Sequence, residues 1–163
     1  MCRSMRRLSS ASVAALALAL APPVAAGPAD SVLSAVNAAR AKAGCAPLRM
    51  NAKLSAAAKG HARAMAEQNF FAHTGKDGVR LPARIARQGY DYQSAAENIA
   101  AGQESAREVV QSWLQSKGHR RNMLDCQMTE TGIAVVYQAD DRPIDGSQYP
   151  LRYYWVQVFA DPA

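Results

Sequence analysis

Apolar residues recur with helical spacing between Ser105 and Gly118, and this is the strongest pattern in the chain. They fall at i, i+3, i+4, i+7 and i+8, which forms one stripe of an amphipathic helix: Ala106, Val109, Val110, Trp113 and Leu114. Ser105 and Glu108 have the spacing of a capping box. Gly118 can adopt the left-handed conformation that ends a helix. The pattern predicts a helix that ends at Gly118 and leaves His119 in the turn beyond it.

Shorter apolar repeats predict three further helices. The first begins at Asp30 or Ser31 and ends at Gly44. The second begins at Asn51 and carries one face of mostly apolar side chains: Leu54, Ala58, His61, Ala62 and Met65. The third is short and has Pro82 in its first turn.

Two residues of the second helix depart from its pattern. Gly60 costs about 1 kcal/mol relative to alanine in a helix interior, and we expect close packing to explain it. His61 lies on the apolar side with no acidic residue three or four positions away. We therefore expect His61 to be a packed residue at the edge of the core.

The C-terminal part predicts two strands that form a hairpin. The segments 132–137 and 153–159 are rich in β-branched and aromatic residues, and Asp145-Gly146 between them is a turn signal. Both faces of the second segment are largely apolar, so we expect it to be covered on both sides. Helices interleaved with short strands predict a layered α/β domain.

The first 26 residues have the features of a secretory signal peptide. Three arginines precede a run of nine apolar residues, and small residues precede a cleavage site after Ala26. An uncleaved membrane anchor is the alternative, but the run is far shorter than the roughly 20 residues that a span needs. We expect residues 27–163 to form a single domain, secreted or periplasmic and monomeric, with no transmembrane segment after cleavage.

Charge and cysteine content narrow the function further. The formal net charge is +6, and half of it comes from the three arginines of the leader, so we expect no nucleic-acid partner. Cys45 and Cys126 remain after cleavage, and an exported chain with one such pair is expected to form a disulfide. Two free thiols or half of a metal site are the alternatives.

Three separated residues have side chains that could do chemistry. His73 follows two aromatic residues in a glycine-rich loop, and His119 follows the long helix. Glu97 lies in a run of small and apolar residues, so a buried carboxylate there must be paired, hydrogen-bonded or protonated. Spacing alone does not show that these three side chains meet.

Five motifs occur in the order typical of the CAP superfamily, also called SCP domains, and resemble its short secreted bacterial branch. They are Phe71-Ala-His73-Thr-Gly75, Ala96-Glu97-Asn98-Ile99, the segment Trp113–Leu124, Thr131-Gly-Ile-Ala-Val135 and Tyr154-Trp-Val-Gln-Val-Phe159. The resemblance covers about Asp30 to Ala160. It implies an α-β-α sandwich with a central antiparallel sheet, and it supports pairing of Cys45 with Cys126.

The resemblance also implies a cavity lined by two histidines and two acidic residues. His73, Glu97 and His119 match three of these positions, whereas the fourth, an acid in the family, falls on Ser116. Two imidazoles and one carboxylate can still hold Zn²⁺ with water as the fourth ligand. Asn98 and Gln157 belong to the same motifs and are expected near the cavity.

Three functions follow as hypotheses. The favoured one is a non-enzymatic binding module whose cavity holds a divalent metal, with a groove beside it for a lipid, a peptide or an envelope component. The second is a hydrolase of the protease type, in which Glu97 acts as general base beside His73 and His119. The third is a structural network, in which the histidines and Glu97 only stabilise the cavity wall.

Overall fold

The structure is a computed structural model that describes residues 26–163, so the signal-peptide prediction lies almost entirely outside the described residues. The elements in chain order are α1 (Pro28–Lys42), β1 (Arg49–Met50), α2 (Ala52–Glu67), α3 (Leu81–Ala86), β2 (Tyr92–Ala101), α4 (Ala106–Gln115), α5 (Lys117–Met123), β3 (Glu130–Tyr137) and β4 (Tyr153–Pro162). Among the described residues, no helix has the length and apolar character needed to cross a bilayer.

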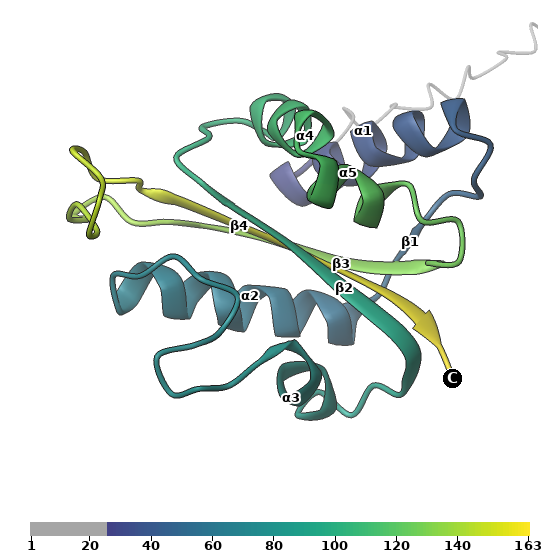
Figure 1. The fold of residues 1–163 in the computed structure, drawn as a ribbon, viewed down its shortest axis with the longest axis horizontal. Coiled ribbons are helices and arrows are strands. Elements are labelled where there is room, and N and C mark those ends of the chain that lie inside the picture. Colours follow the sequence, from purple (N-terminus) through teal and green to yellow (C-terminus); the bar gives the residue numbers. More distant parts are fainter. Residues whose placement is uncertain (1–25) are drawn as a thin grey trace, which may run out of the picture.

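A four-stranded sheet separates two layers of helices (Figure 1). Its strand order is β1-β3-β4-β2, and the three long strands are antiparallel, whereas the two-residue β1 is parallel to β3. Helices α2 and α3 cover one face, and α1, α4 and α5 cover the other (Figure 1). This arrangement confirms the predicted α-β-α sandwich.

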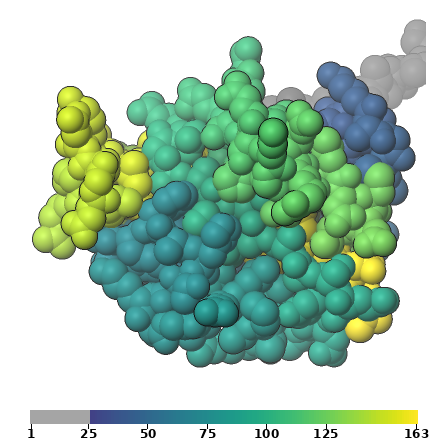
Figure 2. All heavy atoms as spheres, in the orientation of Figure 1, coloured from purple at the N-terminus to yellow at the C-terminus, as the bar shows by residue number. Residues whose placement is uncertain are grey.

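Strand β4 lies between β3 and β2 and is buried from Tyr154 to Ala160, which confirms that it is covered on both sides. Its alternate residues divide between two hydrophobic cores. Tyr154, Val156 and Val158 pack with α2, whereas Trp155 and Phe159 pack with α1 and α4. The loop between β3 and β4, residues 138–152, projects from one end of the molecule (Figures 1 and 2).

Two glycines, Gly132 on β3 and Gly60 on α2, have opposite surroundings. Gly132 on β3 lies so close to α2 that a Cβ atom there would overlap the backbone of Leu54 and Ser55. Gly60 on α2 is exposed, and a Cβ atom there would meet nothing within 4 Å. Close packing therefore explains Gly132, and our expectation of close packing at Gly60 is wrong.

The ends of the first two helices follow local chemistry. The N–H of Gly27 donates to Asp30 Oδ2 at 3.3 Å, so Asp30 caps α1 from inside its first turn rather than preceding it. Gly44 follows α1 with φ of +80°, which confirms the predicted end. Asn51 Oδ1 accepts from the N–H groups of Lys53 and Leu54 and caps α2 as predicted.

The long central helix is interrupted earlier than its pattern predicts. α4 ends at Gln115, Ser116 is extended with ψ of 122°, and α5 begins at Lys117. Gly118 therefore lies inside the first turn of α5 and does not end the helix, and His119 lies on a helix rather than in a turn. The N–H of Arg120 donates to the carbonyl of Ser116 at 2.9 Å, which restarts the helical pattern at once.

The segment after α5 is fixed to the end of α1 by two separate devices. Cys45 and Cys126 form the predicted disulfide, with their Cα atoms 4.9 Å apart. Arg40 is fully buried, and burial lowers the pKa of its guanidinium. It donates four hydrogen bonds of 2.8–2.9 Å to backbone carbonyls, those of Ala46, Met123, Asp125 and Met128.

The two glycines allow one substitution to be tested in opposite directions. Gly60→Ala should raise the free energy of unfolding by about 0.5–1 kcal/mol, because alanine restricts the unfolded chain and meets no neighbour. Gly132→Ala should lower it by about 1–3 kcal/mol or more, because the α2 backbone must move. Urea denaturation measures both, and equal effects of the two changes would contradict this account.

Candidate functional site

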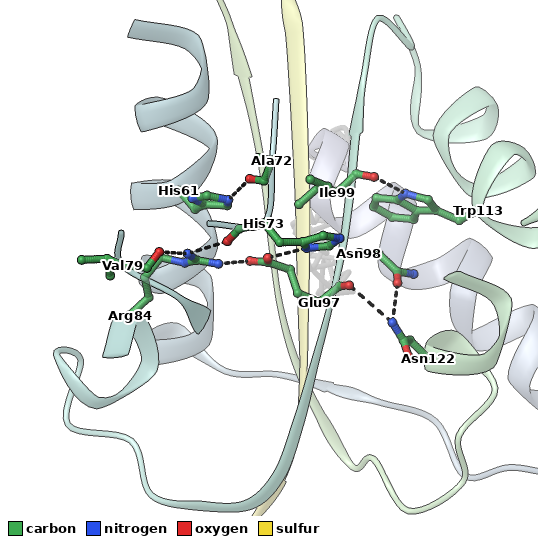
Figure 3. Close-up of polar contacts among 10 residues, drawn as sticks. All are labelled: His61, Ala72, His73, Val79, Arg84, Glu97, Asn98, Ile99, Trp113 and Asn122. Atoms are coloured by element: carbon green, nitrogen blue, oxygen red, sulfur yellow. Dashed lines mark hydrogen bonds and ion pairs between the residues drawn. The ribbon is translucent and has the colours of Figure 1, made fainter. Parts of the chain in front are cut away.

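A buried carboxylate is the centre of the candidate site. The side chain of Glu97, on β2, is only 3% exposed. Its Oε2 accepts from Arg84 Nη2 at 2.7 Å, and its Oε1 lies 2.9 Å from His73 Nδ1 (Figure 3). Because an ionised carboxylate only accepts hydrogen bonds, the proton of this contact lies on Nδ1 of His73. The structure thus brings together two of the three predicted residues, His73 and Glu97.

Arg84 was missed by the sequence analysis. It lies on α3 beside the core residue Ile85, and its side chain is 10% exposed. Its Nη1 also donates to the carbonyls of His73 and Val79 at 3.0 and 3.1 Å, so one guanidinium fixes the carboxylate and the loop that carries His73. The sequence indicated that a buried Glu97 needs a partner, but it did not indicate that the partner is Arg84.

His61 lies close to this group without belonging to it. It is 1% exposed, and its Nε2 lies 2.9 Å from the carbonyl oxygen of Ala72, which confirms the predicted packed histidine. Burial lowers its pKa, while the charge of Glu97 acts in the opposite direction and that of Arg84 adds to the lowering.

The opposite face of β2 carries a second polar group (Figure 3). Successive residues of a strand point to opposite faces, so Asn98 faces α5 while Glu97 faces α3. Asn98 Nδ2 donates to the carbonyl of His119 at 3.1 Å, and Asn98 Oδ1 accepts from Asn122 Nδ2 at 2.9 Å. Asn122 also donates to the carbonyl of Glu97 at 3.3 Å. It was missed as a site residue because nothing in its own motif distinguishes it from a solvated asparagine.

The other predicted site residues lie around this framework. His119 is half-buried on α5; burial lowers its pKa, and the charge of His73 lowers it further. Ser116 lies at the junction of α4 and α5. Gln157 is fully buried on β4, pairs with Asn98 across the strands, and donates to Thr131 Oγ1 at 3.2 Å. The role of Asn98, Ser116 and Gln157 as cavity-lining residues stays a prediction.

The donor set fits a three-ligand zinc ion poorly in this arrangement. Both oxygens of Glu97 already face nitrogen donors, one on Arg84 and one on His73. Across residues 26–163, no group of three or more His, Cys, Asp or Glu side chains is placed to hold a metal ion. Zinc binding at His73, Glu97 and His119 therefore stays a prediction, and we derive no chemical step through a metal.

A second feature is a groove between α1 and α4 on the other side of the sheet. Its volume is about 680 Å³. Its walls are mainly small or apolar. The α1 side contributes Ala35, Ala38, Ala39 and the C-cap residue Ala43, whereas α4 and the segment after α5 contribute Ala106, Val110, Leu114 and Leu124. Lys42 and Arg107 lie at its rim. Alanine on the facing side of α1 leaves space that larger side chains would fill.

Substitutions of Glu97 and Arg84 should have non-additive effects on the free energy of unfolding. Arg84→Met should lower the free energy of unfolding by about 3–5 kcal/mol, because it leaves a buried carboxylate without its cation. Adding Glu97→Gln should restore part of that loss. Arg63→Met breaks the exposed Arg63–Glu67 pair and should cost less than about 1 kcal/mol. Additive effects of the two buried changes in urea denaturation would contradict the pairing.

Stability should decrease as the pH falls from about 7.5 to 5. The pKa of His61 is lower in the folded protein than the unfolded value of 6.5, so the unfolded chain binds more protons in this range. The stability that neutral His61 contributes is present above its unfolded pKa and is lost below it. His61→Gln should flatten the pH dependence measured by urea denaturation. An unchanged slope would show that other groups cause it.

Comparisons with known proteins agree with this fold. The family model described as "Cysteine-rich secretory protein family" matches residues 33–159. The Bacillus subtilis (strain 168) protein YkwD, described as uncharacterized, is 35% identical over 105 residues, which are 64% of this chain and 41% of that protein. The membrane protein YlbC of the same organism, also described as uncharacterized, is 35% identical over 104 residues, 64% of this chain and 30% of its own. The chain thus spans less than half the length of either relative.

Solved structures give the same result. An extracellular protein containing an SCP domain from Bacillus anthracis str. Ames has a TM-score of 0.66 at 26% identity, covering 79% of this chain and 38% of its own. An outer surface protein from Borrelia burgdorferi has a TM-score of 0.70 at 21% identity, covering 81% of this chain and 90% of its own, and shows the shared fold. With the family model matched over most of the described residues, the chain belongs to the cysteine-rich secretory protein family, the CAP superfamily.

Proposed function

We propose that this protein is a secreted, non-enzymatic binding module whose groove between α1 and α4 holds the hydrocarbon part of a lipid-like envelope ligand. The observation that carries the proposal is the groove itself. Its volume of about 680 Å³ lies within the range of small-molecule sites, and its walls are mostly apolar. An apolar chain that enters it leaves water, which is favourable in proportion to the area covered.

The surroundings of the groove support a site that is formed before the ligand arrives. α1 and α4 pack against the sheet through Val36 and Trp113, both fully buried. The backbone walls are therefore set by the core, and binding does not have to order them. The disulfide supports an exported protein, because such bonds persist in oxidising compartments.

The Glu97 group is better suited to support than to catalysis in this proposal. Its carboxylate is buried and bound by Arg84, and that guanidinium also holds the loop of His73. A general base must direct a lone pair at the proton that it removes, whereas Glu97 directs its oxygens at two protein donors. We therefore propose that Glu97 stabilises the fold and that the protein as a whole binds a ligand.

An uncharged ligand tests whether the groove binds a hydrocarbon chain in the absence of electrostatic attraction. A fluorescent long-chain alcohol should bind the wild-type protein saturably, and Ala38→Trp should weaken binding about tenfold or more by filling the groove. Ala41→Trp is the matched control, since Ala41 is an exposed alanine of the same helix that does not line the groove. No saturable binding to the wild type, or equal loss in both variants, would contradict the proposal.

A further inference from the structure

A basic pocket lies beside one end of the groove. The pocket has a volume of about 460 Å³ and is lined by Lys117, Arg120 and Arg121 of α5 together with Leu124, Asp125 and Cys126. Leu124 lines both the pocket and the groove, so the two lie on either side of the same side chain. Helix α5 lies at the surface of the molecule (Figure 2), and its three basic side chains Lys117, Arg120 and Arg121 are exposed.

The cations of this pocket have no carboxylate partner in the part of the chain that the structure describes. The ion pairs found there are Arg49–Glu130, Arg63–Glu67, His73–Glu97 and Arg84–Glu97. The one acidic residue of the lining, Asp125, already accepts a hydrogen bond from the N–H of Gln127 at 3.0 Å. The lining therefore carries three positive charges and one negative charge, and the positive charge is in excess.

The pocket is also rigidly attached to the groove. Arg40 of α1 donates to the carbonyls of Met123 and Asp125, directly beside the lining residues. The disulfide fixes Cys126 to Cys45 just after α1. These bonds fix the backbone beside the pocket, so binding an anion does not have to order it.

The ends of the groove differ in charge, which gives a bound ligand a direction. Ser31 near the start of α1 lies with Ala106 at the start of α4, so the two helices begin together. That end is lined by one acidic and one basic side chain, Glu104 and Arg107, together with Tyr153 and Trp155. Lys42 lies at the other end of α1, nearest the basic pocket, so the positive charge gathers there. α1 has 15 residues and is therefore about 22 Å long.

We infer that the basic pocket binds the phosphate head group of a single anionic amphiphile whose hydrocarbon chain lies in the groove. Arg120 and Arg121 supply charge-assisted hydrogen bonds to phosphate oxygens, and Lys117 adds a further positive charge. The chain of the ligand then runs from the basic pocket toward the start of α1. This inference rests on the proposed function, because it assumes that the groove holds the apolar part. A purely local role for the arginines, complementing the negative end of α5, is the competing account.

The test compares two ligands of equal chain length, the long-chain alcohol and its monophosphate ester, below the concentration at which either forms micelles. The wild-type protein should bind the phosphate ester about tenfold more tightly than the alcohol at low salt. In the variant Arg120→Gln/Arg121→Gln the ratio of the two dissociation constants should fall to about one. Arg63→Gln/Arg87→Gln removes two exposed arginines elsewhere and should leave the ratio unchanged.

Each outcome decides between the two proposals. Binding of the alcohol without preference for the phosphate ester would overturn this inference and leave the groove proposal intact, whereas no binding of either ligand would overturn both. If Arg120→Gln/Arg121→Gln still prefers the phosphate ester, the head group does not bind in the basic pocket. If the protein adsorbs to phosphatidylglycerol vesicles but does not bind the monomeric ester, it is attracted to an anionic surface and does not bind a single lipid molecule.

Discussion

The burial of Arg40 is the constraint on which the α1–α4–α5 layer depends. A guanidinium withdrawn from water must be hydrogen-bonded, and Arg40 satisfies this requirement with four carbonyls, three of them in the segment from the end of α5 onward. The disulfide closes the same junction a few residues away. The end of α1, the end of α5 and the connection to β3 therefore form one rigid corner, and both the groove and the basic pocket open beside it.

A second buried charge organises the other face of the sheet. Glu97 and Arg84 compensate each other, and Arg84 also donates to two carbonyls of the loop that carries His73. The alternation of β2 separates this group from Asn98, which ties α5 to the sheet through His119 and Asn122. Strand β2 thus connects an ionic group on one face with an amide group on the other.

Much of the fold could be predicted from the sequence because it depends on local signals. Asn51 caps α2 by its own side chain, Gly44 ends α1 with a positive φ, and the apolar faces of β4 require cover on both sides. The break between α4 and α5 was missed, since no proline marks it and Gly118, two residues after Ser116, has the features of a helix end. Gly118 was therefore misread as the end of one long helix.

The candidate site was less predictable because its contacts join residues far apart in the chain. The family motifs indicated His73, Glu97 and His119, but the cation that pairs with Glu97 is Arg84, which none of the five motifs includes. The groove left no sequence signal beyond a run of alanines in α1, whose facing side chains are simply too small to fill it. The groove and the Glu97 group lie on opposite faces of one sheet. A ligand in the groove therefore need not touch the histidines, and the two can be altered independently by mutation.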